Sequence, residues 1–260
     1  MVRILIAGEL NPDLILRDYS AFPRLGHEVV VEDMALTLGS ASAICAVGLA
    51  RLGDDVAILG KVGCDDWGVF CCDFLSRAGV DVSTVIHDPA VRTGLTVSVT
   101  SGKDRALITY LGAIENLYVT EFELPHGFTH LHISSYFLQR GLRLGCRELF
   151  AEAHRRGWTT SLDPGCDPSG EWSSDIRDTL EEVDIFLPNE VELAGIAGAA
   201  DPECALRRLQ NGRTLTVAKL GARGCAALED GRLLRAPALP VRPVDTTGAG
   251  DSFDAGFLHA

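Results

Sequence analysis

The sequence has little positive charge, and no run of lysine or arginine is longer than two residues. Its 260 residues include 23 Lys and Arg against 36 Asp and Glu, which gives a formal net charge of −13 at pH 7. Such a charge repels the phosphates of nucleic acids and the surface of anionic membranes. We therefore expect neither nucleic acid nor a membrane as a partner.

Long hydrophobic runs are also absent. No apolar stretch approaches the roughly 18 residues that a membrane-spanning helix needs. The N-terminus, Met-Val-Arg-Ile-Leu-Ile-Ala-Gly, is typical of a buried strand and not of a signal peptide. Together, these features predict a cytoplasmic protein.

Patterns for metal, disulfide and dinucleotide binding are missing as well. None of the eight cysteines forms a Cys-x-x-Cys pair and most lie in apolar stretches, which favours buried free thiols. His130 and His132 alternate on a strand-like segment, but no second pair of ligands accompanies them, so we expect both to be structural. Glu9 and Leu10 follow Gly8 where a Gly-x-Gly-x-x-Gly would be needed, which argues against a dinucleotide-dependent oxidoreductase.

The most informative stretch that is present covers 244–257 and reads Val-Asp-Thr-Thr-Gly-Ala-Gly-Asp-Ser-Phe-Asp-Ala-Gly-Phe. Its glycines favour a tight turn, and a helix is expected to follow with one apolar face made by Phe253, Phe257 and Leu258. Four backbone N–H groups would then point into a concavity that suits an anion, those of Gly248, Ala249, Gly250 and Asp251. The carboxylate of Asp251 would accept a proton from a hydroxyl while the amides stabilise a phosphoryl group in transit.

The segment from Asp245 to Asp251 resembles the signature Asp-Thr-x-Gly-Ala-Gly-Asp of the ribokinase-like (PfkB-type) carbohydrate kinases. The resemblance extends over nearly all of the chain. It implies an α/β fold with a mainly parallel central sheet flanked by helices, and an ATP- and Mg²⁺-dependent kinase that acts on a sugar hydroxyl. It also implies that Asp251 is the catalytic base and that Gly248, Ala249 and Gly250 form the anion cradle.

Asn11 and Asp13 follow the first strand and match the family string Gly-x-x-Asn-x-Asp, which begins here at Gly8. Ligands of α/β sheets bind at the carboxyl ends of the strands. The resemblance implies that both residues line the substrate site and that Asp13 holds sugar hydroxyls. The alternative for Asp13 is a turn residue after Pro12.

A second family string, Gly-Gly-x-x-x-Asn-x-Ala, is matched only in part. Gly39 is retained, but Ser40 replaces the second glycine and Ile44 replaces an asparagine that binds a sugar hydroxyl. Gly39, Ser40 and Ile44 are thus the candidate substrate contacts here. A hydroxyl buried against Ile44 would lose a partner, at a cost of about 1–3 kcal/mol. Ile114 likewise replaces a family asparagine, and these two apolar positions suit the base of a nucleoside.

Asn189 and Glu192 match the family string Asn-x-x-Glu, which organises hydrated magnesium near the nucleotide phosphates. A helix-capping box is the alternative, since an asparagine followed by glutamate three residues later satisfies it without any metal. The resemblance also makes Asp245 and Thr247 candidate ligands of a monovalent cation such as K⁺.

Lys219, Gly221 and Gly224 resemble a family turn beside the nucleotide, Lys/Thr-Leu-Gly-x-x-Gly. Lys219 either reaches a phosphate or is a solvated residue at the end of a strand. Thr246 is implied as a further nucleotide contact. In the segment 163–167, Asp167 replaces a family arginine, which argues against an acidic or already phosphorylated sugar bound through that contact.

Strand and helix patterns alternate along the chain, and the resemblance implies a single ribokinase-like domain over 1–260. Hairpin strands within about 13–35 and 93–110 break this alternation and are expected to form an inserted lid, which in some family members pairs with a second subunit. Helical spacing predicts one helix from Leu142 to Arg155. Family members usually continue for several tens of residues, so a C-terminal part of the domain is expected to be missing after Ala260.

The predicted function is the ATP-dependent phosphorylation of a hydroxyl on a sugar or a sugar-like substrate. A nucleoside kinase of the same fold is the alternative within this class. The alternative from another class is a catalytically weak, ligand-binding homologue. The intact Asp251 argues against that last interpretation.

Overall fold

The computed structural model describes residues 2–19, 21–101, 104–172, 175–242 and 246–260. Within these residues, eight strands form the central sheet, in the order β14-β13-β12-β11-β10-β9-β1-β4. The strands from β12 to β4 run parallel, and β13 and β14 are antiparallel at one edge. Their bounds are Arg3–Ala7 (β1), Asp55–Leu59 (β4), His130–Ile133 (β9), Thr159–Leu162 (β10), Ile185–Phe186 (β11), Leu215–Lys219 (β12), Cys225–Glu229 (β13) and Arg232–Ala236 (β14).

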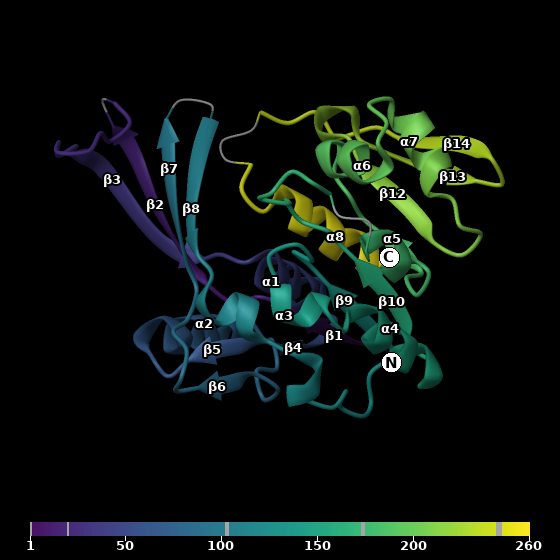
Figure 1. The fold of residues 1–260 in the computed structure, drawn as a ribbon, viewed down its shortest axis with the longest axis horizontal. Helices are drawn as coiled ribbons and strands as arrows, with labels where there is room; N and C mark the ends of the chain where they lie inside the picture. The colour runs from purple at the N-terminus through teal and green to yellow at the C-terminus, as the bar shows by residue number, and fades with distance from the viewer. Residues whose placement is uncertain (1, 20, 102–103, 173–174, 243–245) are drawn as a thin grey trace.

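Helices cover both faces of this sheet because the strands are apolar on both sides (Figure 1). Ile4 and Ile6 of β1 pack in one core cluster with α1 (Ala41–Leu52), α2 (Asp66–Arg77) and α8 (Ala249–His259). Leu5 and Ala7 point to the other face and join a second cluster. That cluster contains side chains of α4 (Cys146–Arg155), α5 (Asp175–Leu180), α6 (Glu190–Ala197) and α7 (Pro202–Leu209). The predicted α/β architecture is confirmed.

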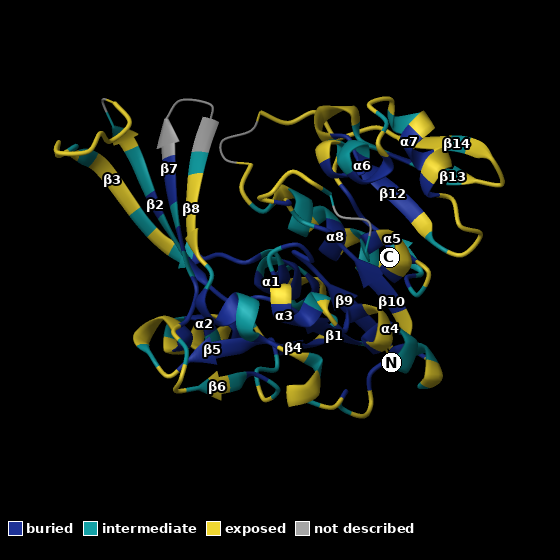
Figure 2. Ribbon diagram, in the orientation of Figure 1, coloured by how far each residue is buried: buried dark blue, intermediate teal, exposed yellow. Residues whose placement is uncertain are grey.

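A separate four-stranded sheet projects from this body at the left of Figure 1. It has the order β3-β2-β7-β8, with bounds Pro12–Tyr19 (β2), Val31–Leu38 (β3), Leu95–Ser101 (β7) and Asp104–Tyr110 (β8). We call it the lid sheet. A short parallel pair lies below it, β5 (Lys61–Gly63) and β6 (Ile86–Asp88). Much of β3 and β8 is exposed, whereas β1 and β9 are buried (Figure 2).

The helix predicted from Leu142 to Arg155 is interrupted. A short helix, α3 (Arg140–Arg143), precedes α4, and Gly145 separates the two. A Cβ on Gly145 would overlap Val119 of the 3₁₀ helix η2 (Val119–Glu121), so glycine allows the close packing found at the break. The remaining 3₁₀ helices are η1 (Gly112–Asn116) and η3 (Gly221–Arg223). In the described part of the chain, no helix combines the length and apolar character needed to cross a bilayer.

Candidate active site

The glycine-rich turn forms the start of α8, as its sequence predicts. Gly248 is the residue before the helix and has φ 72°, a conformation that glycine adopts without a steric cost. Ser252 closes the turn by donating from its N–H (2.9 Å) and its hydroxyl (2.8 Å) to the carbonyl of Gly248. The Ala249 N–H donates to the carbonyl of Thr246 (3.2 Å). The prediction that all four cradle amides lack partners is therefore wrong for Ala249.

Ile44 lies directly against this turn. A Cβ built on Gly248 would be 3.2 Å from both Cδ1 and Cγ2 of Ile44, which is closer than ordinary van der Waals contact, so Ile44 leaves little space beside this glycine. Ile44 belongs to the first turn of α1, which packs along α8. The structure thus brings the candidate substrate residue of α1 next to the candidate catalytic turn.

Ser40 caps the N-terminus of α1. It is the N-cap with φ 69°, a left-handed conformation that explains why a glycine is favoured at this position. Its hydroxyl accepts the N–H of Ala43 (3.0 Å) and donates to the carbonyl of Glu9. The hydroxyl of Ser40, expected to contact substrate, is therefore engaged within the protein.

Glu9 is a functional candidate that the sequence patterns missed. Its carboxylate is buried at the N-terminus of α1, where it accepts the N–H of Ala41 (2.8 Å) and the hydroxyl of Ser42 (2.6 Å). Burial raises the pKa of Glu9, while these hydrogen bonds oppose the shift. The side chain fills the position where a helix N-terminus attracts an anion. Its position directly after a glycine at a strand end was the available signal.

Asn11, Asp13 and Gly39 come together at the base of the lid sheet. The Asn11 amide donates to Asp13 Oδ1 (3.1 Å), to the Pro12 carbonyl (3.2 Å) and to Thr96 Oγ1 (3.3 Å). A Cβ on Gly39 would overlap the Asp13 carboxylate, so glycine leaves the space that this carboxylate occupies. Three of the five residues that the sequence assigns to substrate binding are thus neighbours.

Asn189 and Glu192 form the capping box that was the alternative to a metal site. Asn189 Oδ1 accepts the N–H groups of Val191 (2.9 Å) and Glu192 (3.0 Å), and Glu192 accepts the Asn189 N–H (2.8 Å) and side-chain amide (2.6 Å). Glu192 is buried, and burial together with Asp163 raises its pKa to about 8. A cation beside it would offset this unfavourable burial of charge.

Lys219 is neither solvated nor unpaired. It is the last residue of β12 and is buried, with its ammonium donating to Asp163 Oδ2 (2.5 Å) and to Asp254 Oδ1 (3.0 Å) and Oδ2 (2.9 Å). Asp163 follows β10, and Asp254 belongs to α8. We call these three residues the lysine cluster. A Cβ on Gly250 would be 3.6 Å from the ammonium, so the cluster lies directly beside the glycine-rich turn.

The charges of the lysine cluster shift one another's pKa values. Burial and the nearby carboxylate of Asp163 raise the pKa of Asp254 well above its ordinary value. Burial alone would also raise the pKa of Asp163, but the ammonium of Lys219 and hydrogen bonds lower it. Burial opposes charge on Lys219, yet the two carboxylates outweigh it and raise its pKa. The lysine is therefore held firmly in its charged form.

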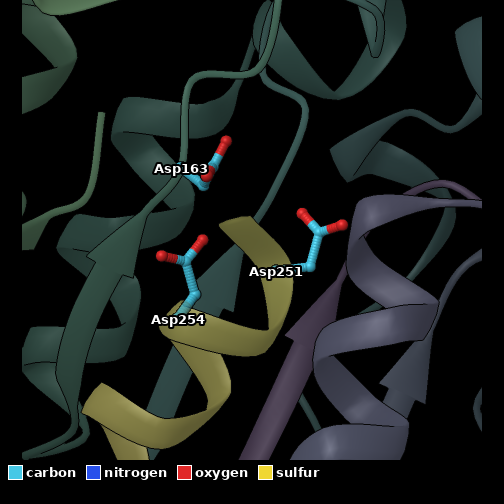
Figure 3. A group of neighbouring side chains, drawn as sticks. All are labelled: Asp163, Asp251 and Asp254. Carbon is cyan, nitrogen blue, oxygen red and sulfur yellow. The ribbon is translucent and has the colours of Figure 1, made fainter. Parts of the chain in front are cut away.

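Asp251 lies close to this cluster. One oxygen from each of Asp163, Asp251 and Asp254 is within 4.8 Å of the others, and Figure 3 shows Asp251 and Asp254 on α8 with Asp163 at the end of the neighbouring strand. Only Asp251 had been assigned a role from the sequence. The predicted apolar face of α8 is partly wrong, because Asp254 and Ala255 are buried while Phe253 and Phe257 stack on each other, half-exposed.

The other predicted nucleotide and cation residues lie around the same edge of the sheet. Gly221 (φ 56°) and Gly224 (φ 84°) form the turn between β12 and β13, and a Cβ on Gly224 would overlap the carbonyl of Ala236. Thr246 and Thr247 are exposed in front of α8. Asp245, the other candidate ligand of a monovalent cation, lies outside the described residues.

Two further departures from the family strings have structural explanations. Ile114 is buried, and a Cβ on Gly94 would be 2.6 Å from its Cδ1, so the side chain packs under the start of β7. Asp167 accepts the N–H (2.9 Å) and the hydroxyl (2.8 Å) of Ser169, and the N–H of Trp172 (2.8 Å). Asp167 therefore shapes its own loop.

His130 and His132 are structural, as expected. Their rings are buried and form a chain of hydrogen bonds with hydroxyl groups, each 2.7–2.8 Å long, from Thr159 through Ser161 to Ser134. We call these five residues the histidine network. Burial lowers the pKa of His130 to about 4 and that of His132 to about 3, so both rings are neutral.

The cysteines are free thiols, but burial was predicted correctly for only some of them. Cys45, Cys71 and Cys146 are buried, and burial raises the pKa of each. Three others are exposed, namely Cys64, Cys166 and Cys204.

The sequence is similar to those of known carbohydrate kinases. Residues 1–260 match the model of the pfkB family carbohydrate kinases. A fructokinase from Klebsiella pneumoniae is 35% identical over 233 residues, which cover 85% of this chain and 75% of that protein. A ribokinase from Haemophilus influenzae is 26% identical over 264 residues, covering 98% of this chain and 84% of that protein.

Solved structures share the fold at lower sequence identity. A putative ribokinase II from E. coli has a TM-score of 0.86 and 22% identity, and the match covers 100% of this chain and 86% of that chain. An adenosine kinase from Sinorhizobium meliloti has a TM-score of 0.85 and 23% identity, and the match covers 99% of this chain and 86% of that chain. With the family model spanning the whole sequence, the chain belongs to the PfkB family of carbohydrate kinases, which transfer a phosphoryl group to a hydroxyl.

Proposed function

We propose that this protein transfers the γ-phosphoryl group of ATP to a hydroxyl of a sugar or a sugar-like substrate, with Asp251 as the general base. The observation that carries the proposal is the contact between Ile44 and the turn at Gly248. It brings the candidate substrate side of the protein, at the start of α1, against the candidate phosphoryl-binding turn.

The proposed reaction uses groups of this chain at each step. Asp13 orients the substrate, and Asp251 accepts the proton of the reacting hydroxyl. The oxygen then bonds to the γ-phosphorus as the bond to the β,γ-bridging oxygen breaks, which releases ADP. The N–H groups at the start of α8 stabilise the charge on the phosphoryl group.

Asn189 and Glu192 are the proposed holders of Mg²⁺, through water. A nearby cation would favour the charged form of Glu192, which burial disfavours, and each carboxylate oxygen that accepts a hydrogen bond retains further lone pairs. When bound, the metal would neutralise charge on the nucleotide phosphates. ATP and Mg²⁺ are supported by a solved structure of a putative E. coli ribokinase II in complex with both, which is 21% identical. The K⁺ site and the cytoplasmic location stay predictions.

A nucleoside kinase is the second candidate, and one observation favours it. Ile44 presents an apolar surface beside the catalytic turn, where a nucleobase or a deoxygenated ring would lose no hydrogen bond. The ribokinase and fructokinase relatives support a sugar as the substrate, and the structural similarity to an adenosine kinase is compatible with a nucleoside as the substrate.

We also propose a homodimer through the lid sheet. Its register places Leu36, Leu14, Val97 and Ile108 in one apolar row across the four strands. Ile108 is 58% exposed and the neighbouring Met34 is 59% exposed, and a second copy would cover this face. Sedimentation should give a dimer for the wild type and a monomer for Ile108→Glu. A wild-type monomer at all concentrations would reject the dimer.

The substitution Asp251→Asn tests the catalytic proposal because it removes only the proton acceptor. We expect kcat to fall at least about 100-fold while ATP binding and thermal stability stay close to wild type. Rates would be measured as ADP release, and ATP binding by calorimetry. A turnover within a few-fold of wild type would reject Asp251 as the base.

A further inference from the structure

The lysine cluster joins three segments that are far apart in the sequence. Lys219 ends β12 and Asp163 follows β10, and β11 lies between those two strands in the sheet. The side chains of Lys219 and Asp163 therefore meet across the carboxyl edge of the sheet, between strands that are two strand spacings or roughly 10 Å apart. Asp254 approaches the same ammonium from α8. One buried cation thus ties a helix to two strands.

This tie lies immediately behind the catalytic turn. Asp254 is three residues after Asp251 and therefore one helical turn away from it. The Lys219 ammonium is 3.6 Å from the position of a Cβ on Gly250, and the carboxylates of Asp251 and Asp254 approach within 4.8 Å (Figure 3). Any shift of Asp254 relative to the sheet would consequently move the base and the amides of the turn.

The three neighbouring aspartates do not need a metal ion to explain them. The ammonium of Lys219 already contacts two of them, Asp163 and Asp254, and supplies the positive charge there. Stability does not explain the arrangement either, since well-packed apolar side chains of similar volume are often at least as stable as a buried ion pair. What a buried ion pair does provide is a directional link with one geometry.

We propose that Lys219 and Asp254 are positioning residues, which hold the first turns of α8 against the sheet so that Asp251 and the turn amides meet the reacting groups. This inference rests on the proposed function of Asp251. Reactive geometry is sensitive to such support, because a displacement of about 1 Å can cost roughly 100-fold in rate.

The test compares two substitutions of Asp254 with a control at the other end of the same helix. Asp254→Leu removes the link, whereas Asp254→Asn keeps an oxygen that accepts from Lys219. We expect Asp254→Leu to lower kcat about 10- to 100-fold, with the KM values for ATP and for the sugar within about threefold of wild type. Asp254→Asn should restore kcat to within about fivefold. Should Asp254→Leu fail to fold, Asp254→Ser, whose hydroxyl is too short to reach the ammonium, replaces it.

His259→Ala is the matched control. It removes a second side-chain contact of α8, between His259 Nδ1 and Asp54 Oδ2 (2.9 Å), far from the turn. It should lower the melting temperature and leave kcat unchanged. Loss of kcat in His259→Ala as large as in Asp254→Leu would show that any loosening of α8 suffices, and would overturn the proposal.

Two other results would also overturn it. One is a kcat for Asp254→Leu or Asp254→Ser within threefold of wild type. The other is an Asp254→Asn variant as slow as Asp254→Leu. Parallel assays of Asp251→Asn separate this inference from the proposed function. If Asp251→Asn is inactive and Asp254→Leu is not, only the positioning role fails; if Asp251→Asn stays active, the base assignment itself fails.

Discussion

The central sheet buries two groups of polar side chains, the histidine network and the lysine cluster, and it satisfies them in different ways. The histidine network lies within β9, β10 and the residue that follows β9, and it is made of neutral rings and hydroxyls that pair along a chain. The lysine cluster lies at the carboxyl ends of β10 and β12 and carries charge. Charge is thus buried where the sheet meets the glycine-rich turn of α8, and neutral groups fill the strand interior.

This difference separates a structural polar site from a functional one. Neutral hydrogen bonds satisfy buried groups at low electrostatic cost. Buried charges are costly unless they are paired, so their presence beside Asp251 and Glu192 suggests a use beyond stability. The first two of the four predictions below test whether the two groups behave differently.

The largest effect is expected from Lys219→Met. It leaves the buried carboxylates of Asp163 and Asp254 without their cation, and should lower the free energy of unfolding by about 3–5 kcal/mol. Urea titration at neutral pH measures this. Arg223→Met serves as the control, because it breaks an ion pair with Glu190 whose side chains are 54% and 43% exposed, and should change little. Equal effects of the two substitutions would remove the distinction between buried and surface charge.

The histidine network should make the protein sensitive to acid. The folded pKa values of about 4 and 3 lie below the unfolded value of 6.5, so the stability that both rings contribute is present above pH 6.5 and lost as pH falls. At pH 5 each ring should cost about 2 kcal/mol of unfolding free energy. His132→Gln should reduce the difference between urea titrations at pH 7 and pH 5. An unchanged difference would contradict neutral burial of His132.

A smaller effect is expected at Ile44, on the substrate side of the charged region. Ile44→Asn should reduce kcat/KM on the natural substrate and improve it on ribose or fructose, changing their ratio about 10-fold. The comparison uses ribose, fructose, a deoxy sugar and a nucleoside, with the KM for ATP as the control. If the wild type already strongly prefers ribose or fructose, or if the ranking is unchanged, position 44 does not select the substrate.

The sequence predicted the features that depend on local order. The turn at Gly248 and the first strand follow from short strings with defined backbone demands, and so does the box of Asn189 and Glu192, which was the alternative to a metal site. The neighbourhood of Asn11, Asp13 and Gly39 came from the family resemblance, because residues at one strand end and one helix start converge in this fold.

Features that need distant segments to meet could not be predicted. Lys219 pairs with residues 56 and 35 positions away, and no local pattern distinguishes it from a solvated strand-end lysine. The polar Asp254 gave no sign that it would be buried, so Phe253 and Phe257 were assigned to the inner face of α8 instead. Likewise, the close packing of Gly145 against Val119 at the interruption before α4 is a contact between distant segments, which helical spacing alone does not contain.

The most direct test of the central claim is ADP release by the wild-type protein, with ATP and Mg²⁺, in the presence and absence of acceptor. The account predicts that ADP forms in a one-to-one ratio with a phosphorylated acceptor, for at least one of fructose, ribose, a deoxy sugar and adenosine, and that release without acceptor is at least about 100-fold slower. ATP binding without acceptor-dependent ADP release for any of these compounds would contradict it.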